Sequence, residues 1–183
     1  MDIGPLPPDL QEVVRFHGHL CPGLLIGYRA AKAAAQYLGL GPSRDEELVA
    51  VVENNSCSVD AFQYLLSTTF GKGNLIWHDH GKQVFTVIDR DHGRAVRVSF
   101  IGDRLKSKGP DGKVDREAFA RALLGAPQEQ VVALLEVPPE PPAEAVIEPS
   151  LFCARCGEPV QASRAVKIGE RVLCKPCAVQ EAS

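Results

Sequence analysis

The chain has 183 residues, of which 45% are hydrophobic and 23% are charged, and its formal net charge at pH 7 is −3. This composition is that of a globular protein, and the small net charge provides no overall field that would attract nucleic acid or an acidic membrane. We expect a cytoplasmic protein, because no basic segment followed by an apolar run opens the chain and no stretch approaches the roughly 18 apolar residues of a membrane span.

Helical and extended patterns alternate along the first part of the chain. Helices are predicted at residues 22–38, 59–69 and 116–124. Strands are predicted at residues 48–53, 75–78, 83–89 and 94–101. The segment 131–137 fits either one more strand or a helix end. This order predicts an α+β domain with two layers, in which helices lie on a mixed sheet.

A change in composition near residue 138 predicts a domain boundary. The stretch 138–150 contains five of the 14 prolines and three Glu, which is typical of an extended, semi-rigid linker. We therefore expect a main domain over 1–137 and a small second domain over 151–183.

The segment 151–183 carries two Cys-x-x-Cys pairs. They are Cys153 with Cys156 and Cys174 with Cys177. Four thiolates in two such turns match tetrahedral zinc, and because four protein sulfurs leave no open position, we predict a structural zinc ribbon. An iron site of the rubredoxin type is the alternative. The segment is too short to build a sufficient core, so the metal is expected to fold it.

Five basic residues accompany the ribbon cysteines. They are Arg155, Arg164, Lys167, Arg171 and Lys175. They can form a face for nucleic acid or for a partner protein, or only a solvated surface. A docking or purely structural role is favoured over nucleic-acid binding.

Ligand-type residues alternate in the segment FHGHLCPG. In an extended segment His17, His19 and Cys21 would project to the same side and converge on one ion. Cys21 precedes Pro22 at the start of the first predicted helix, where the amide dipoles favour a thiolate. The alternative is that the two His cap backbone groups and that Cys21 is a small buried hydrophobic residue.

A second cluster lies in ENNSCSVDAFQ, between a predicted strand and a predicted helix. Cys57 and Asp60 are three residues apart and share a face of the first helical turn. Cys57 is thus a second thiolate candidate, Asp60 a candidate ligand or general base, and Gln63 lies one turn further along. Ordinary capping with a buried thiol is the alternative.

Two glycine turns, FGKGNL and DHGKQVF, each contain a lysine. Lys72 or Lys82 can meet an anionic group, and Asn74 with its neighbouring glycines permits close approach of a ligand. The spacing is not that of a Walker phosphate loop. Along the first predicted helix, Gly23, Gly27 and two alanines recur every four residues, a stripe that favours close helix packing within the chain or across a dimer.

Taken together, FHGHLCPGLLIGYRAAKAA, ENNSCSVDAFQYL, TTFGKGNL and DHGKQVFTV resemble the FmdE domain, which takes its name from formylmethanofuran dehydrogenase. The similarity covers about 1–137, and the ribbon is similar to a zinc-finger extension of many members. The resemblance implies a mixed sheet with the order helix, strand, helix and three strands, and a homodimer. It implies a metal site at His17, His19 and Cys57, with Cys21, Asp60, Gln63 and Lys72 nearby. His80 receives no role from it.

The family name does not make this chain a dehydrogenase. That chemistry needs a pterin-bound molybdenum or tungsten centre and iron–sulfur relays, which 183 residues with two cysteines outside the ribbon cannot house. We expect a metal-binding protein whose open His/Cys site lies in a small-ligand pocket, accessory to such enzymes. Three protein ligands leave a position for water or a small anion, and in an enzyme Asp60 would serve as base.

Mixed imidazole and thiolate ligands suit zinc in the main domain, with nickel, iron and copper as alternatives. The alternative function is a sensor of a metal or metabolite, or an adaptor, whose ribbon contacts nucleic acid or a partner protein.

Overall fold

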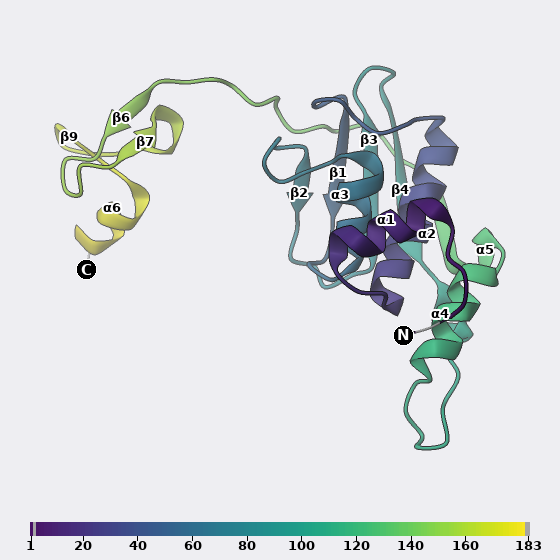
Figure 1. The fold of residues 1–183 in the computed structure, drawn as a ribbon. Helices are drawn as coiled ribbons and strands as arrows, with labels where there is room; N and C mark the ends of the chain where they lie inside the picture. The colour runs from purple at the N-terminus through teal and green to yellow at the C-terminus, as the bar shows by residue number, and fades with distance from the viewer. Residues whose placement is uncertain (2, 182–183) are drawn as a thin grey trace. The chain divides into compact units, whose positions relative to one another are not determined.

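The computed structural model describes residues 1 and 3–181 (Figure 1). The chain divides into two compact units, Met1–Glu144 and Ala145–Ser183. Residues 138–149, which include most of the Pro-rich stretch, form neither helix nor strand. In the described part of the chain, no helix combines the length and the apolar character needed to cross a bilayer.

The first unit is built on a five-stranded mixed sheet with the order β2-β1-β3-β4-β5. Its strands are β1 (Leu48–Val52), β2 (Leu75–Trp77), β3 (Val84–Asp89), β4 (Arg94–Phe100) and β5 (Val132–Glu136). β1 pairs in parallel with β2, and the pairs β1–β3, β3–β4 and β4–β5 are antiparallel. The α+β class and the mixed sheet expected from the sequence are therefore confirmed.

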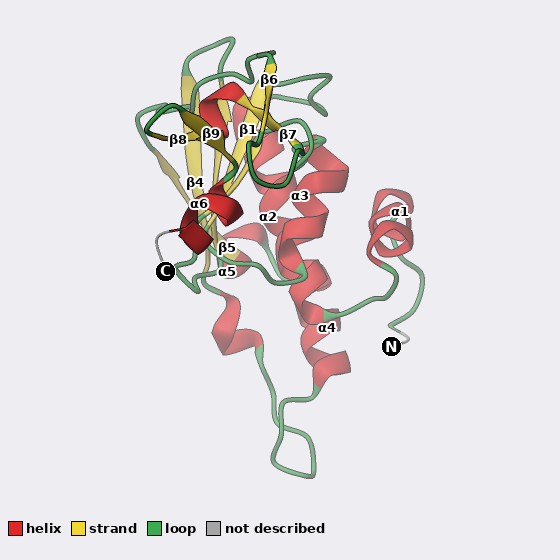
Figure 2. Ribbon diagram, turned by 90° about the vertical axis from the view of Figure 1, so that its left-hand side faces the viewer, coloured by secondary structure: helices red, strands yellow, loops and turns green. Residues whose placement is uncertain are grey.

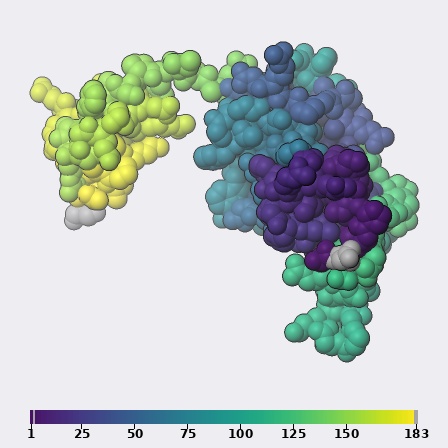
Figure 3. All heavy atoms as spheres, viewed as in Figure 1, coloured from purple at the N-terminus to yellow at the C-terminus, as the bar shows by residue number. Residues whose placement is uncertain are grey.

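Figure 2 shows α1, α2 and α3 on one side of the strands. The helices of the first unit are α1 (Pro8–His17), α2 (Pro22–Leu38), α3 (Ser58–Leu66), α4 (Arg116–Gly125) and α5 (Gln128–Val131), with a 3₁₀ turn at Gly102–Leu105. The N-terminal residues, purple in Figure 3, cover part of one face of this unit. The helices and the sheet enclose the main core, in which the Phe62 and Phe85 rings stack with centroids 4.4 Å apart.

The structure differs from the sequence-based expectations at the N-terminus and at His17. Helix α1 was not predicted, because only Leu10 and Val13 of its ten residues are buried and the apolar signal is weak. His17 is the last residue of α1, so the extended arrangement expected for His17, His19 and Cys21 is wrong. The segment 131–137, left open between helix and strand, is mainly strand β5.

The small-residue stripe of α2 brings it against α3. A Cβ atom at Gly27 would lie 2.0 Å from the backbone oxygen of Ser58, a distance that real atoms do not reach. Because backbone cannot move aside as a flexible side chain can, we expect Gly27→Ala to lower the free energy of unfolding by about 3 kcal/mol. Urea denaturation measures this change.

The matched control for that variant is Gly125→Ala at the end of α4, where an added Cβ meets nothing within 4 Å. Alanine has the higher helix propensity, so this change should be neutral or stabilise by up to about 1 kcal/mol. Equal effects of the two substitutions would contradict the close packing of α2 on α3.

The second unit consists of two short hairpins and a helix. Its elements are β6 (Ser150–Phe152), β7 (Pro159–Gln161), β8 (Val166–Ile168), β9 (Arg171–Leu173) and α6 (Lys175–Glu181), with a 3₁₀ turn at Ala162–Arg164. Its buried cluster is made of two cysteines, one leucine and one alanine, namely Cys153, Cys177, Leu173 and Ala178. Such a core is too small to hold the unit together by apolar burial alone.

Candidate metal centres

Four residues singled out in the sequence meet in the first unit. His17, His19, Cys21 and Cys57 each offer one ligand atom, and these atoms all lie within 4.8 Å of one another. The two imidazole rings have centroids 4.5 Å apart. His17 ends α1, His19 lies in the following turn, and the two cysteines stand just before α2 and α3. A metal ion can be held by groups at this spacing.

The turn after α1 brings the two histidines together. Gly18 has φ of 95°, and its backbone N–H donates to the carbonyl of Val14, which closes the helix. Side chains with a Cβ rarely adopt this conformation, so glycine is required here. The helix therefore ends between His17 and His19, and the chain turns there. Their convergence comes from a helix end and not from strand alternation.

Cys21 and Cys57 are held by the first turns of α2 and α3. The Cys21 Sγ accepts a hydrogen bond from the backbone N–H of Leu24 at 3.4 Å. A Cβ at Gly23 would lie 3.3 Å from the Cys57 Cβ, so the glycine lets the two thiols approach. Burial, and then the neighbouring Cys21 thiol, raise the pKa of Cys57. A bound cation would favour the thiolate form of Cys57.

His17 is oriented by a carboxylate. Its Nδ1 lies 2.6 Å from the Asp60 Oδ2, and the Gln63 Nε2 donates to the Asp60 Oδ1 at 3.0 Å. An imidazole whose Nδ1–H donates to a carboxylate leaves a lone pair on Nε2. Within the described residues, the buried Nε2 of His17 has no hydrogen-bond partner. The donor set and this orphaned atom fit a metal ion.

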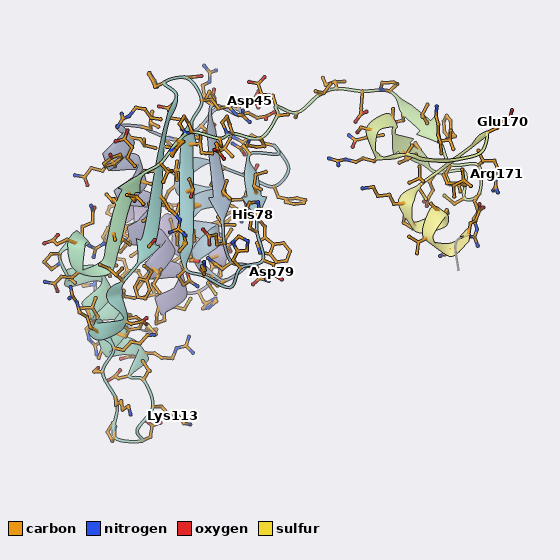
Figure 4. All side chains as sticks on the ribbon, turned by 180° about the vertical axis from the view of Figure 1, so that it is seen from behind. Asp45, His78, Asp79, Lys113, Glu170 and Arg171 are labelled. Carbon is orange, nitrogen blue, oxygen red and sulfur yellow. The ribbon has the colours of Figure 1, made fainter. Side chains whose placement is uncertain are left out.

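Two further residues predicted to bind a ligand lie on the turn before β2. The Lys72 Nζ donates to the backbone carbonyls of Ser43 and Asp45, and the buried Asn74 amide donates to those of Asp45 and Leu48. In Figure 4, Asp45 lies near one end of the sheet, and His78 and Asp79 lie toward its other end. The structure thus gives Lys72 and Asn74 a role in anchoring this turn.

His80, whose role the sequence left open, belongs to an ionic cluster around Glu53. The Glu53 carboxylate accepts from the Arg97 Nη2 at 2.9 Å, and its Oε2 lies 3.2 Å from the His80 Nδ1 and 4.0 Å from the Lys82 Nζ. Burial alone would raise the pKa of Glu53, but the hydrogen bond with His80 and the charges of Arg97 and Lys82 lower it. Lys82 thus has a carboxylate partner in the first unit.

The second unit contains the other candidate centre. Cys153, Cys156, Cys174 and Cys177 also bring their sulfurs within 4.8 Å of one another. The backbone N–H groups of Cys156, Cys174 and Arg155 lower the pKa of Cys153 to about 6. The adjacent Cys174 thiol and burial raise the pKa of Cys177 to about 12. Four thiolates this close repel one another unless a cation neutralises them.

An α+β domain with one His/Cys cluster and a separate unit with four cysteines define a protein with two candidate metal centres. Residues 16–141 match the family described as "FmdE, Molybdenum formylmethanofuran dehydrogenase operon". The chain therefore belongs to the FmdE family.

Two known proteins resemble the chain over most of its length. A "Probable S-adenosyl-L-methionine-binding protein" of Archaeoglobus fulgidus is 30% identical over 194 residues, which cover 92% of this chain and 52% of that protein. The chain thus spans about half the length of this curated relative. The crystal structure of a "tungsten formylmethanofuran dehydrogenase subunit e (fmde)-like protein" from Syntrophus aciditrophicus matches with a TM-score of 0.67 and 24% identity. The match covers 95% of this chain and 92% of that one, and it shows the fold.

Proposed function

We propose that the first unit is a metal-binding domain in which His17, His19 and Cys57 hold one ion. The buried Nε2 of His17, which has no partner among the described residues, is the observation that carries this proposal. The Cys21 Sγ belongs to the same cluster of candidate ligands. In the arrangement that the resemblance to the FmdE family implies, Cys21 stands beside the ion and a fourth position is left for water or a small anion, which suits ligand binding or metal-assisted chemistry.

Zinc is the metal we propose for both centres. Mixed imidazole and thiolate ligands suit zinc, and so does a set of four thiolates. Elemental analysis would also detect nickel, iron or copper, the alternative metals for the first unit. Elemental analysis of the full chain, purified without chelators or affinity metals, should find two ions per chain. If the chain holds a single ion and Cys156→Ala loses it, that ion belongs to the second unit. This result would refute the centre in the first unit.

Asp60 is better suited to positioning His17 than to acting as a general base, because its carboxylate already accepts from His17 and Gln63. We expect Asp60→Asn to lower the affinity of the first unit for zinc by about 10-fold to 100-fold. The neutral amide favours the His17 tautomer with the proton on Nδ1 less strongly than the carboxylate does. Competition with a coloured chelator measures the affinity. The exposed Asp79→Asn is the control and should leave it unchanged.

For the whole chain we propose an accessory role beside a molybdenum- or tungsten-dependent formylmethanofuran dehydrogenase-type enzyme. The description of the family, which refers to the operon of such an enzyme, supports this role. Co-purification of the enzyme with the tagged full chain from its native host tests it. The homodimer implied by the resemblance belongs to the same proposal, and sedimentation of the purified chain measures it.

A sensor or adaptor that uses the ribbon to contact nucleic acid has less support. The Arg155 guanidinium donates to the carbonyl of Cys177, and the Arg171 guanidinium pairs with Glu181 at 2.9 Å. Two of the five basic side chains are thus engaged within the unit. A salt-dependent gel shift with the full chain would nevertheless favour this second function.

A further inference from the structure

A cavity of about 230 Å³ lies beside the candidate metal centre of the first unit. Its apolar walls come from Val52 at the end of β1, Val59 in the first turn of α3 and Leu75 at the start of β2. Phe70 and Trp77 also line it. The volume is below the roughly 300–1,000 Å³ of sites for drug-sized ligands, so its occupant is small.

The two aromatic residues of this cavity are unusually open to solvent. Phe70 is 82% exposed and Trp77 is 52% exposed. Leaving large apolar rings in water forgoes the stabilisation that their burial would give, and contiguous exposed apolar surface in a folded protein marks a binding site. The ring faces are also suited to stacking and to contact with a cation.

The turn that carries Phe70 is held in place by hydrogen bonds. The fully buried Asn74 accepts from the backbone N–H of Thr69 at 2.8 Å, and the backbone N–H of Gly73 donates to the carbonyl of Phe70 at 3.2 Å. Lys72 ties the same turn to the carbonyl of Asp45 at 3.0 Å. The exposed ring therefore sits on an anchored turn, which lowers the entropy cost of binding a ligand.

The charge of the cavity is negative. Of the residues that line it, all in the described part of the chain, Asp60 carries the only formal charge. Its side chain is 33% exposed, and each carboxylate oxygen keeps a lone pair beyond its bonds to His17 and Gln63. A cationic nitrogen in the cavity would be attracted by this carboxylate, and no lysine or arginine of the lining would repel it.

We propose that this cavity binds a small ligand with a flat apolar ring and a cationic nitrogen, of the arylalkylamine class. The ring lies between Phe70 and Trp77, and the ammonium donates to Asp60. This site goes beyond the metal-binding function and does not require the metal. Because Asp60 also orients His17, an occupied cavity places the ligand next to the metal centre.

Trp77, the single tryptophan of the chain, reports binding directly. We would titrate the full protein with phenethylamine and with 3-phenylpropionate, which share a phenyl ring and differ in the sign of the charge. Excitation of tryptophan at a wavelength where phenyl groups do not absorb avoids interference. We expect a saturable change in emission with phenethylamine, and an affinity for 3-phenylpropionate at least about 10-fold weaker.

Variants separate this site from the metal centre. Phe70→Ala should weaken phenethylamine binding by about 10-fold without changing the bound metal, while Phe152→Ala, which removes a similarly exposed ring elsewhere, should change neither. Asp60→Asn should abolish the preference for phenethylamine over 3-phenylpropionate. A first unit that holds no metal but still binds phenethylamine would refute the metal centre alone.

Four results would overturn the proposed site. Three are no saturable response to phenethylamine, equal affinity for both probes, and unchanged binding in Phe70→Ala. The fourth is that a second copy of the chain occupies the cavity. In that case the protein would sediment as a dimer with Trp77 shielded from acrylamide quenching, and Phe70→Ala would yield a monomer with Trp77 accessible.

Discussion

Replacing Cys57 with alanine in the full chain is expected to remove one metal ion per chain and to leave the other in place. Cys57 supplies the thiolate of the proposed first centre, and the two imidazoles that remain bind zinc far more weakly than a set that includes a thiolate. Elemental analysis after gel filtration measures the loss. Circular dichroism should show an intact fold, because Cys57 makes no side-chain hydrogen bond that caps α3.

The reciprocal variant makes this experiment decisive. Cys156→Ala removes an exposed ligand of the ribbon and should abolish the other ion, while the ion of the first unit stays bound. A Cys57→Ala protein that still carries two ions would show that Cys57 is not needed to hold the ion of the first unit. Retention of both ions in both single variants would show that neither cluster holds its metal through these thiols.

Removing the metal from the second unit is expected to unfold that unit while the first keeps its core. The buried cluster of the second unit is small and includes Cys153 and Cys177, so coordination must supply most of its folding free energy. Structural zinc contributes about 10–16 kcal/mol in small zinc-binding peptides at pH 7. Hydrogen exchange before and after chelation should show that amides of residues 151–177 lose protection.

The first unit provides the internal reference for this measurement. Amides of β3, which carries Phe85 of the stacked pair, and of the neighbouring β4 should keep their protection after chelation. Phe152→Ala serves as the control variant, because Phe152 is 73% exposed and the loss of its ring should leave the ribbon protected. Persistent protection of the ribbon without metal would contradict a fold that depends on coordination.

Elements with strong local patterns were predicted close to their observed bounds. The Ala-rich pattern between Pro22 and Gly39 corresponds to α2, and the β-branched run after residue 47 corresponds to β1. Helix α1 lacked such a pattern, since it contacts the core through few side chains. Its absence from the prediction led to an extended arrangement for His17 that the structure replaces with a helix end.

The candidate ligands were found because cysteine and histidine are uncommon and their spacings are short. Their surroundings were not predictable in the same way. The hydrogen bond of His17 with Asp60 joins residues 43 positions apart, and no local signal identifies which carboxylate a histidine will meet. Lys72 and Asn74 looked like ligand-binding residues of a glycine turn, yet their bonds to backbone carbonyls depend on where the chain near Asp45 passes.

The sequence by itself determined the α+β class and the two Cys-x-x-Cys pairs, because periodicity and close spacing are local properties of a chain. Only the tertiary structure decided that His17 and Cys57 lie together and that Asp60 orients His17. It also decided that Phe70 stands exposed on an anchored turn. These relations arise from packing α1 and α3 beside α2 over the sheet, where the contact free energy is shared among residues distant in the chain.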